Sequence, residues 1–171
     1  MPANGTAGLS ALIFYVVTYG LTVVGAFGVV SAIEEKTGDA KLSDFAGLSR
    51  REPVLAFCMM IFMLSLAGIP PLAGFFGKFY VFTAAVGGAK DLGLLWLVIL
   101  AIATSAVSLY YYLQVLKQIY VAPVPDGPAP ARAAISTQVI LVVIAAAVVI
   151  LGLAPGLLLI PLLTAIQHAG W

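Results

Sequence analysis

Lys78 is the residue whose position in this chain points most directly to chemistry. It is the only charged residue between Glu52 and Lys90, and it lies in an apolar stretch from Val54 to Val86. A charged side chain at membrane depth is costly, and it is found where it faces other helices or water. Burial disfavours the charged ammonium, so a lysine in this setting can gain and lose a proton in a working cycle. We therefore predict that Lys78 is a proton relay.

The alternative for Lys78 is a structural one. A lysine can lay its stem along apolar surface and extend its ammonium to the membrane interface. Lys78 lies eight residues before Val86, so its side chain could reach the end of the apolar stretch. The sequence leaves both interpretations open.

Two adjacent prolines, Pro70 and Pro71, precede the lysine in the same apolar stretch. Proline lacks an N–H, and its ring clashes with the carbonyl four residues back, so the carbonyls of Leu66 and Ala67 lose their helical partners. Gly68 lowers the cost of irregular backbone dihedrals at this point. We expect a break in the helix whose freed polar groups face protein or a hydrated cavity.

Hydroxyl side chains recur in the apolar stretches before and after the lysine. They are candidates for the polar lining of a hydrated path, and the alternative is that they only pack between helices. The candidate residues are Tyr15, Thr18, Tyr19, Thr22, Ser65, Ser105 and Ser108. We interpret the tyrosine triplet from Tyr110 to Tyr112 as an interfacial belt rather than a proton-conducting group.

Other chemistry finds no support in the sequence. The single cysteine, Cys58, and the single histidine, His168, have no partners at metal-ligand spacing. Gly77-Lys78 lacks the other residues of a phosphate-binding loop. We predict no cofactor site and no metal site in this chain. The net charge of +1 gives no general attraction to nucleic acid.

The composition predicts an integral membrane protein of the all-α class. Of the 171 residues 63% are hydrophobic and 9% are charged, and the mean hydropathy is +1.13. We expect four transmembrane segments, at about residues 9–33, 54–87, 94–120 and 135–163. The second is too long for one helix across a hydrocarbon core of about 30 Å, so we predict a discontinuous helix broken near residues 68–72. In the fourth, Pro155-Gly156 is expected to kink or end the regular part.

Two connections are predicted on the same side of the membrane. Residues 34–52 form a charged loop with a solvated face, in which a short interfacial helix begins at Ser43 and directs Phe45 and Leu48 towards the headgroups. Residues 121–134 form a proline-rich loop.

Basic residues indicate which side of the membrane these two connections face. The side with these two loops carries Lys36, Lys41, Arg50, Arg51, Lys117 and Arg132, whereas the other side carries only Lys90. The excess of lysine and arginine predicts that both loops are cytoplasmic and that both chain ends are on the exterior, periplasmic side.

Two runs of sequence resemble a known family. They are Leu48-Ser-Arg-Arg-Glu-Pro-Val-Leu-Ala-Phe57 and Phe62-Met-Leu-Ser-Leu-Ala-Gly-Ile-Pro-Pro-Leu-Ala-Gly-Phe-Phe-Gly-Lys-Phe-Tyr-Val-Phe82. They are similar to the antiporter-like membrane subunits of the proton-pumping NADH–quinone oxidoreductase (respiratory complex I), and among them to subunit N (chain 2). Tyr15–Val30 resembles the preceding helix of that family, and Ser108–Leu113 the following one.

The resemblance implies a fold with inverted repeats of five helices within fourteen spans, each repeat containing a broken helix with an ionisable residue. The chain resembles the last four spans, so we expect a C-terminal portion of that fold, from a truncated or split gene. Lys78 matches the lysine of the second broken helix, on the path from the membrane midplane to the exterior. The first repeat has no counterpart here, so we expect the fragment alone to be inactive.

The resemblance also implies a function. It is that of a membrane-arm subunit, in an enzyme complex of the translocase type, which contributes to proton translocation coupled to NADH oxidation and quinone reduction. NADH, FMN, iron–sulfur clusters and quinone are then expected in other subunits. The implied partners are the lipid bilayer and the other membrane-arm subunits, including the N-terminal part of the same subunit, and the implied location is the bacterial inner (plasma) membrane.

Two alternatives stay open. The first is a subunit of a multisubunit sodium/proton antiporter, whose membrane chains share the same repeat. The second is a non-transporting scaffold fragment that only packs against its neighbours.

Overall fold

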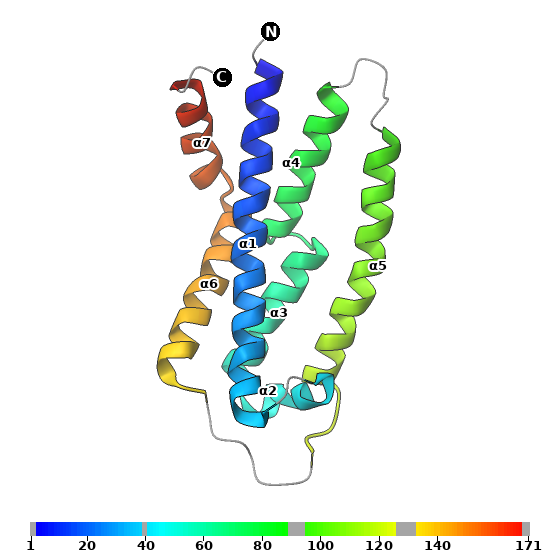
Figure 1. Ribbon diagram of the computed structural model, residues 1–171, viewed down its shortest axis with the longest axis vertical. Helices are drawn as coiled ribbons and strands as arrows, with labels where there is room; N and C mark the ends of the chain where they lie inside the picture. Colours follow the sequence, from blue (N-terminus) through cyan, green and yellow to red (C-terminus); the bar gives the residue numbers. More distant parts are fainter. Residues whose placement is uncertain (1–2, 39–40, 89–94, 126–132, 169–171) are drawn as a thin grey trace.

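The computed structural model describes residues 3–38, 41–88, 95–125 and 133–168. Within these ranges the chain is helical and contains no β-strand (Figure 1). The helices are α1 (Ala3–Thr37), η1 (Leu42–Phe45), α2 (Leu48–Arg51), α3 (Pro53–Ala67), α4 (Ala73–Gly88), α5 (Leu95–Tyr120), α6 (Ile135–Leu153) and α7 (Gly156–His168). The predicted all-α membrane fold with a discontinuous second segment is confirmed.

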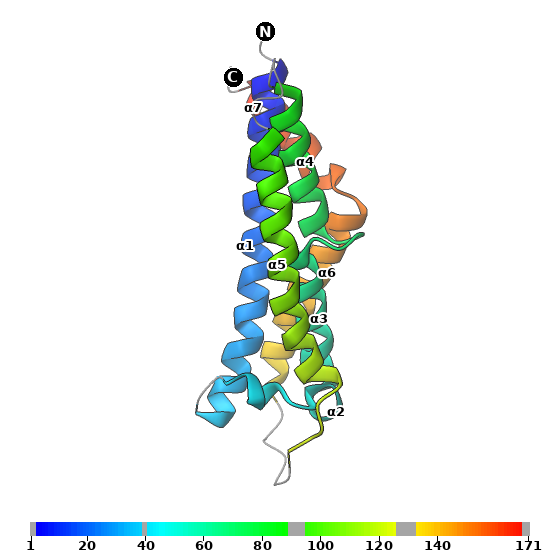
Figure 2. The same ribbon diagram turned by 90° about the vertical axis from the view of Figure 1, so that its right-hand side faces the viewer.

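The helices form an elongated bundle around α1, which runs the length of the molecule (Figures 1 and 2). Helices α3 and α4 follow one another end to end beside α1, while α5 and the α6–α7 pair lie on opposite sides of them. The first turn of α1 and the last turn of α7 lie at one end of the bundle, and η1 and α2 lie at the other (Figure 1). The chain therefore runs from one end of the bundle to the other an even number of times.

In the part of the chain that the structure describes, three helices are long and apolar enough to cross a membrane singly. They are α1, over Gly8–Thr37, α5 and α6, with 30, 26 and 19 residues. Helices α3 and α4 have 15 and 16 residues, so neither is as long as these three. Together, placed end to end, they extend over the length of the bundle (Figure 2).

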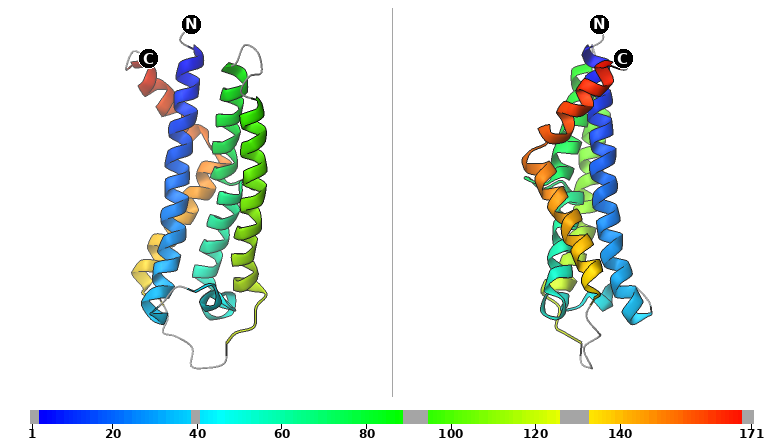
Figure 3. Two further views of the ribbon diagram at one scale, coloured as in Figure 1. Left: turned by 45° about the vertical axis from the view of Figure 1, so that its right-hand side comes forward. Right: turned by 90° about the vertical axis from the view of Figure 1, so that its left-hand side faces the viewer.

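The fourth segment is also made of two helices, which meet at a bend (Figure 3). Helix α6 ends at Leu153, and α7 begins at Gly156. Pro155 has no N–H to continue the helical hydrogen bonds of α6, which explains the interruption. Helix α7 extends to His168, beyond the predicted end at residue 163.

Glycine allows the helices to approach α1 closely. Gly25 of α1 lies against the ring of Phe62 on α3, and a Cβ at Gly28 would come within 2.8 Å of Leu141 Cδ2 on α6. Phe62 is fully buried at 0% exposure, and Leu141 is 2% exposed. Because any side chain at these two glycines would displace the facing residue, they fix the distance between α1 and its neighbours.

The predicted interfacial helix at Ser43 is not formed as expected. The chain makes the short 3₁₀ helix η1, followed by Gly47 with φ 63° and then by α2. Gly47 donates its N–H to the carbonyl of Gln118 at 3.0 Å, which ties this turn to the end of α5. A left-handed residue interrupts a helix, so one continuous interfacial helix cannot run through Gly47.

The hydrophobic residues of this loop face the protein rather than the headgroups. Phe45 is 5% exposed and Leu48 is 2% exposed, and both belong to a core cluster that includes Ile119 and Leu55. The expected orientation towards the membrane surface is therefore wrong. Both side chains pack instead against α3 and the end of α5, which removes their apolar surface from water.

Some charges of the loop are also not solvated. Glu52 is 6% exposed, and its Oε1 accepts from Lys36 Nζ at 2.6 Å and from the N–H of Ala133 at 2.8 Å. Glu34 and Arg50 are exposed, as expected. A buried charge requires such partners, so Glu52 joins the end of α1, the start of α3 and the segment before α6.

Candidate functional site

The break between α3 and α4 leaves the backbone carbonyl of Leu66 without a helical N–H donor. Helix α3 closes at Gly68, which adopts φ 81° and donates its N–H to the carbonyl of Ser65 at 2.9 Å. The Pro70–Pro71 peptide bond that follows is cis. The carbonyl of Leu66 accepts a hydrogen bond at 3.0 Å from Nζ of Lys78. The side chain of Lys78 thus replaces a backbone donor that the prolines cannot supply.

Lys78 is half-buried and directs its ammonium towards the broken end of α3. Its second hydrogen bond goes to Oγ of Ser105 on α5. The carboxyl end of a helix carries a partial negative charge, which stabilises a cation placed there. Lys78 therefore does not extend to the membrane interface in this structure, and the structural alternative does not describe its conformation.

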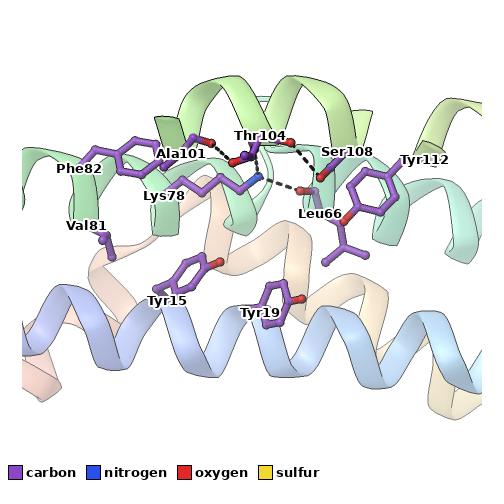
Figure 4. A pocket seen from close by; sticks show the side chains of 11 residues that line it. Tyr15, Tyr19, Leu66, Lys78, Val81, Phe82, Ala101, Thr104, Ser108 and Tyr112 are labelled. Atoms are coloured by element: carbon purple, nitrogen blue, oxygen red, sulfur yellow. Dashed lines mark hydrogen bonds between the residues drawn. The ribbon is translucent and has the colours of Figure 1, made fainter. Parts of the chain in front are cut away.

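A cavity of about 360 Å³ opens beside Lys78 between α1, α4 and α5 (Figure 4). Its polar lining consists of Tyr15, Tyr19, Lys78, Thr104, Ser105, Ser108 and Tyr112. The Thr104 hydroxyl donates to the carbonyl of Leu100, and that of Ser108 donates to the carbonyl of Thr104, each at 3.0 Å. With their protons engaged on the helix, these hydroxyl oxygens are left as acceptors. A polar cavity of this size has room for several water molecules.

The candidate residues fall into two groups. The first group lines the cavity of about 360 Å³ beside Lys78, and we call this cavity the outer cavity. The group consists of Tyr15, Tyr19, Ser105 and Ser108. Thr18, Thr22 and Ser65 are 0–1% exposed, and they line a second cavity of about 10 Å³ that also reaches Lys78. We call this second one the inner cavity.

Sequence reasoning missed two residues of the outer cavity, Thr104 and Tyr112. Tyr112 belongs to the tyrosine triplet that we interpreted as an interfacial belt. It lines the outer cavity, whereas its neighbours Tyr110 and Tyr111 are 60% and 64% exposed. Thr104, Ser108 and Tyr112 are spaced four residues apart. That spacing places them on one face of a helix, and it was the signal that could have identified them.

An apolar cavity of about 360 Å³ lies on the other side of Lys78, between α4 and α5. Phe75, Phe79, Ile102 and Leu109 are among its lining residues, and Lys78 and Ser105 are shared with the outer cavity. The hydrogen bond between Lys78 and Ser105 therefore separates a polar space from an apolar one.

The site offers proton transfer as its chemistry. The ammonium of Lys78 contacts the hydroxyl group of Ser105 and lines a cavity that can hold water. Within the residues that the structure describes, no three His, Cys, Asp or Glu side chains come together to form a metal-binding group.

The sequence is similar to known membrane subunits. A family described as "NADH:quinone oxidoreductase/Mrp antiporter, TM" matches residues 1–107. A subunit N 2 of NADH-quinone oxidoreductase from Acidobacterium capsulatum is 52% identical over 157 residues, covering 92% of this chain and 32% of that protein. A subunit N from Myxococcus xanthus is 43% identical over 153 residues, covering 86% of this chain and 29% of that protein. The chain thus spans about a third of the length of these curated relatives.

Solved structures of membrane complexes are also similar to this chain. A chain of respiratory complex I from Thermus thermophilus, solved with bound aureothin, is 37% identical with a TM-score of 0.72, over 88% of this chain and 33% of that one. A chain of the Mrp complex from Dietzia sp. has a TM-score of 0.81 at 24% identity, over 94% of this chain and 37% of that one. At that identity the second likeness concerns the fold alone.

Proposed function

We propose that this membrane-spanning chain, which belongs to the NADH:quinone oxidoreductase/Mrp antiporter family, acts within subunit N of an NADH–quinone oxidoreductase and carries protons through Lys78. In this proposal it contributes to proton translocation in the membrane arm of the complex, coupled to NADH oxidation and quinone reduction. NADH, FMN, iron–sulfur clusters and quinone bind to other subunits. Its partners are the other membrane-arm subunits and the parts of subunit N that this chain does not span.

The observation that carries the proposal is the position of Lys78 at the helix break. The ammonium contacts the carbonyl of Leu66 and the hydroxyl of Ser105, and it lines the outer cavity. Neither partner carries a formal charge, so no ion pair holds the proton on the lysine. A lysine with neutral partners beside a polar cavity is suited to exchange its proton with water.

The hydrogen bonds of Lys78 are compatible with that exchange. A lysine ammonium has three N–H donors, and two of them are engaged by Leu66 and Ser105. A neutral amine keeps two N–H donors, so both hydrogen bonds survive when the proton leaves. The third position then holds the lone pair that accepts the next proton. Proton exchange thus requires no rearrangement of the side chain.

The names of the curated relatives favour this function over the sodium/proton antiporter. Those at 52% and 43% identity are subunits of NADH-quinone oxidoreductase, whereas the Mrp chain is 24% identical. We further propose that the chain lies in the inner membrane of a bacterium. The end with η1 and α2 faces the cytoplasm, since basic residues are concentrated in the loops at that end.

Substitution of Lys78 in the assembled complex tests the proposal. Lys78→Met keeps much of the volume but removes the ammonium, and Lys78→Arg keeps a charge that does not leave the side chain at physiological pH. Both variants should assemble, and both should lower proton pumping and quinone reduction several-fold. NADH oxidation with an artificial electron acceptor should persist, because the hydrophilic part of the complex is unchanged.

Lys117 provides the matched control, since it is an exposed lysine in the last turn of α5. Lys117→Met and Lys117→Arg should both pump protons normally. The deciding quantity is the number of protons pumped per electron in sealed vesicles. A normal ratio at normal turnover in the Lys78→Arg variant would contradict a proton-carrying role for Lys78.

A further inference from the structure

Helix α6 presents one buried stripe to the rest of the bundle. The stripe consists of Leu141, Ala145, Val148 and Gly152, which are spaced four, three and four residues apart. That spacing places them on one face of a helix. The stripe ends in a residue without a side chain, one position before α6 itself ends at Leu153. The end of α6 lies at the level of the break between α3 and α4 (Figure 1).

Gly152 is in direct contact with the backbone of this break. A Cβ at position 152 would overlap the carbonyl oxygen of Pro71, and it would lie 2.7 Å from the carbonyl carbon of Leu72 and from the nitrogen of Ala73. Because these neighbours are backbone atoms, no rotation of a side chain could make room for it. Helix α6 therefore packs against the start of α4 with its own main chain.

The start of α4 is held by α3 as well as by α6. Gly74 lies so near the carbonyl of Ser65 on α3 that a Cβ would overlap it, and the adjacent Ala73 lies against Gly152 of α6. Ala73 is 0% exposed. With backbone atoms of both helices in contact, the first turn of α4 has no free space in which to move towards either of them.

The position of Lys78 depends on this first turn. Lys78 lies five residues after Ala73 in the same helix, and its Nζ donates to the carbonyl of Leu66 on α3 at 3.0 Å. Hydrogen bonds between residues four apart make a helix stiff over so short a distance. A shift at the start of α4 would therefore move the ammonium, whereas Leu66 would stay with α3.

The other end of α6 is also fixed. Ala133, just before α6, donates its N–H to Glu52 Oε1 at 2.8 Å, and the same oxygen accepts from Lys36 Nζ at 2.6 Å. The carbonyl of Ala133 accepts from Nε2 of Gln138, in the first turn of α6, at 2.9 Å. Helix α6 is thus tied to α1 and α3, and it cannot slide along the bundle without breaking these bonds.

We propose that α6 is a positioning element for Lys78. Anchored by Glu52, it holds the first turn of α4 through Gly152, and it thereby keeps Lys78 Nζ within hydrogen-bonding distance of the Leu66 carbonyl. Gly152 and Glu52 act through other residues, so they are positioning residues rather than catalytic ones. The expected effect on proton pumping rests on the proposed function, whereas the expected effect on the geometry of the break does not.

Gly152→Ala in the assembled complex tests the proposal. The added methyl group should displace the start of α4, so a structure of this variant should show Lys78 Nζ beyond hydrogen-bonding distance of the Leu66 carbonyl. Proton pumping per assembled complex should fall several-fold. Gly156→Ala is the matched control, because within 4 Å a Cβ there would meet only Ile160 Cδ1, at an ordinary 3.5 Å. It should pump normally.

A double variant separates positioning from a general loss of stability. If Gly152 acts through Lys78, Gly152→Ala combined with Lys78→Met should pump no less than Lys78→Met alone, because the contact that Gly152 protects is already gone. A glycine that only stabilises the bundle would instead add its own loss to that of Lys78→Met.

Glu52 provides a second variant that loosens α6 without adding bulk. Glu52→Ala leaves the Ala133 N–H without its acceptor, so pumping should fall, again with no further loss in the Lys78→Met background. Glu52→Gln keeps an oxygen acceptor at nearly the same place and should retain most of the pumping. If Gly152→Ala does not assemble, these two variants decide.

Three results would overturn the proposal. They are an unchanged distance between Lys78 Nζ and the Leu66 carbonyl in Gly152→Ala, normal pumping in Glu52→Ala, and losses that add to that of Lys78→Met. If Lys78→Met and Lys78→Arg both pump normally, the proposed function fails. The distance in the Gly152→Ala structure then still decides whether α6 positions Lys78.

Discussion

Ser105 is the side chain that connects Lys78 to α5. Its Oγ accepts from Lys78 Nζ, and this contact separates the polar outer cavity from the apolar cavity between α4 and α5. A hydrogen bond to a charged group contributes about 1.5–3 kcal/mol. The loss of Ser105 should therefore leave Lys78 less well positioned at the break.

We expect Ser105→Ala to assemble normally and to lower the rate of proton pumping by several-fold. Ser108→Ala is the matched control: Ser108 lines the same cavity, but its hydroxyl donates to Thr104. Pumping rates in vesicles at equal amounts of complex make the comparison. An equal loss in both variants would show that Ser105 matters for the polarity of the cavity rather than for the position of Lys78.

At the residue scale, a functional residue could be predicted where its type differs from the types of its neighbours in the sequence. Lys78 was identifiable because no other charge lies within the same apolar stretch. Tyr112 was not, because tyrosine near the end of a span is also what the membrane interface favours. The burial of Glu52 could not be foreseen either, since its partner Ala133 is 81 positions away in the sequence.

At the scale of elements, the break depends on how closely α4 approaches the end of α3. Gly74, in the first turn of α4, has the carbonyl of Ser65 so near that a Cβ would overlap it. The Gly74 N–H also donates to Ser65 Oγ at 3.1 Å. A side chain at position 74 would therefore push apart the two half-helices and, with them, Lys78 and Leu66.

We expect Gly74→Ala to lower the midpoint of thermal denaturation of the complex and to lower proton pumping. Gly20→Ala is the control, because a Cβ at Gly20 meets nothing within 4 Å. Alanine is favoured over glycine in a helix by about 0.5–1 kcal/mol, so Gly20→Ala should be neutral or stabilising. A normal midpoint and normal pumping in Gly74→Ala would mean that the break tolerates a wider separation.

Elements were predictable where a single residue type dictates the backbone. The proline pair made the break predictable, because proline removes a hydrogen bond whatever its neighbours are. The helix expected at Ser43 failed at Gly47, whose left-handed conformation is coupled to a hydrogen bond with Gln118 of α5. The sequence around Gly47 does not indicate this contact with α5.

At the scale of the whole molecule, the even number of crossings determines the topology. The two ends of the described chain lie together, opposite η1 and α2 (Figure 1). Ser43, in η1, and Gly87, in the last turn of α4, therefore lie at opposite ends of the bundle, and both are exposed. A Cβ at Gly87 meets nothing within 4 Å, so a cysteine fits there.

Labelling with a membrane-impermeant thiol reagent tests both the crossing and the orientation. In a Cys58→Ala background, which removes the one native cysteine, Ser43→Cys should react only when the cytoplasmic face is accessible. Gly87→Cys should react only from the exterior, and both should react in detergent. Reaction of both positions from the same side would mean that α3 and α4 together return to the side where they began. Reaction from opposite sides in the reverse sense would keep the crossing but invert the proposed orientation, and the basic loops would then face the exterior.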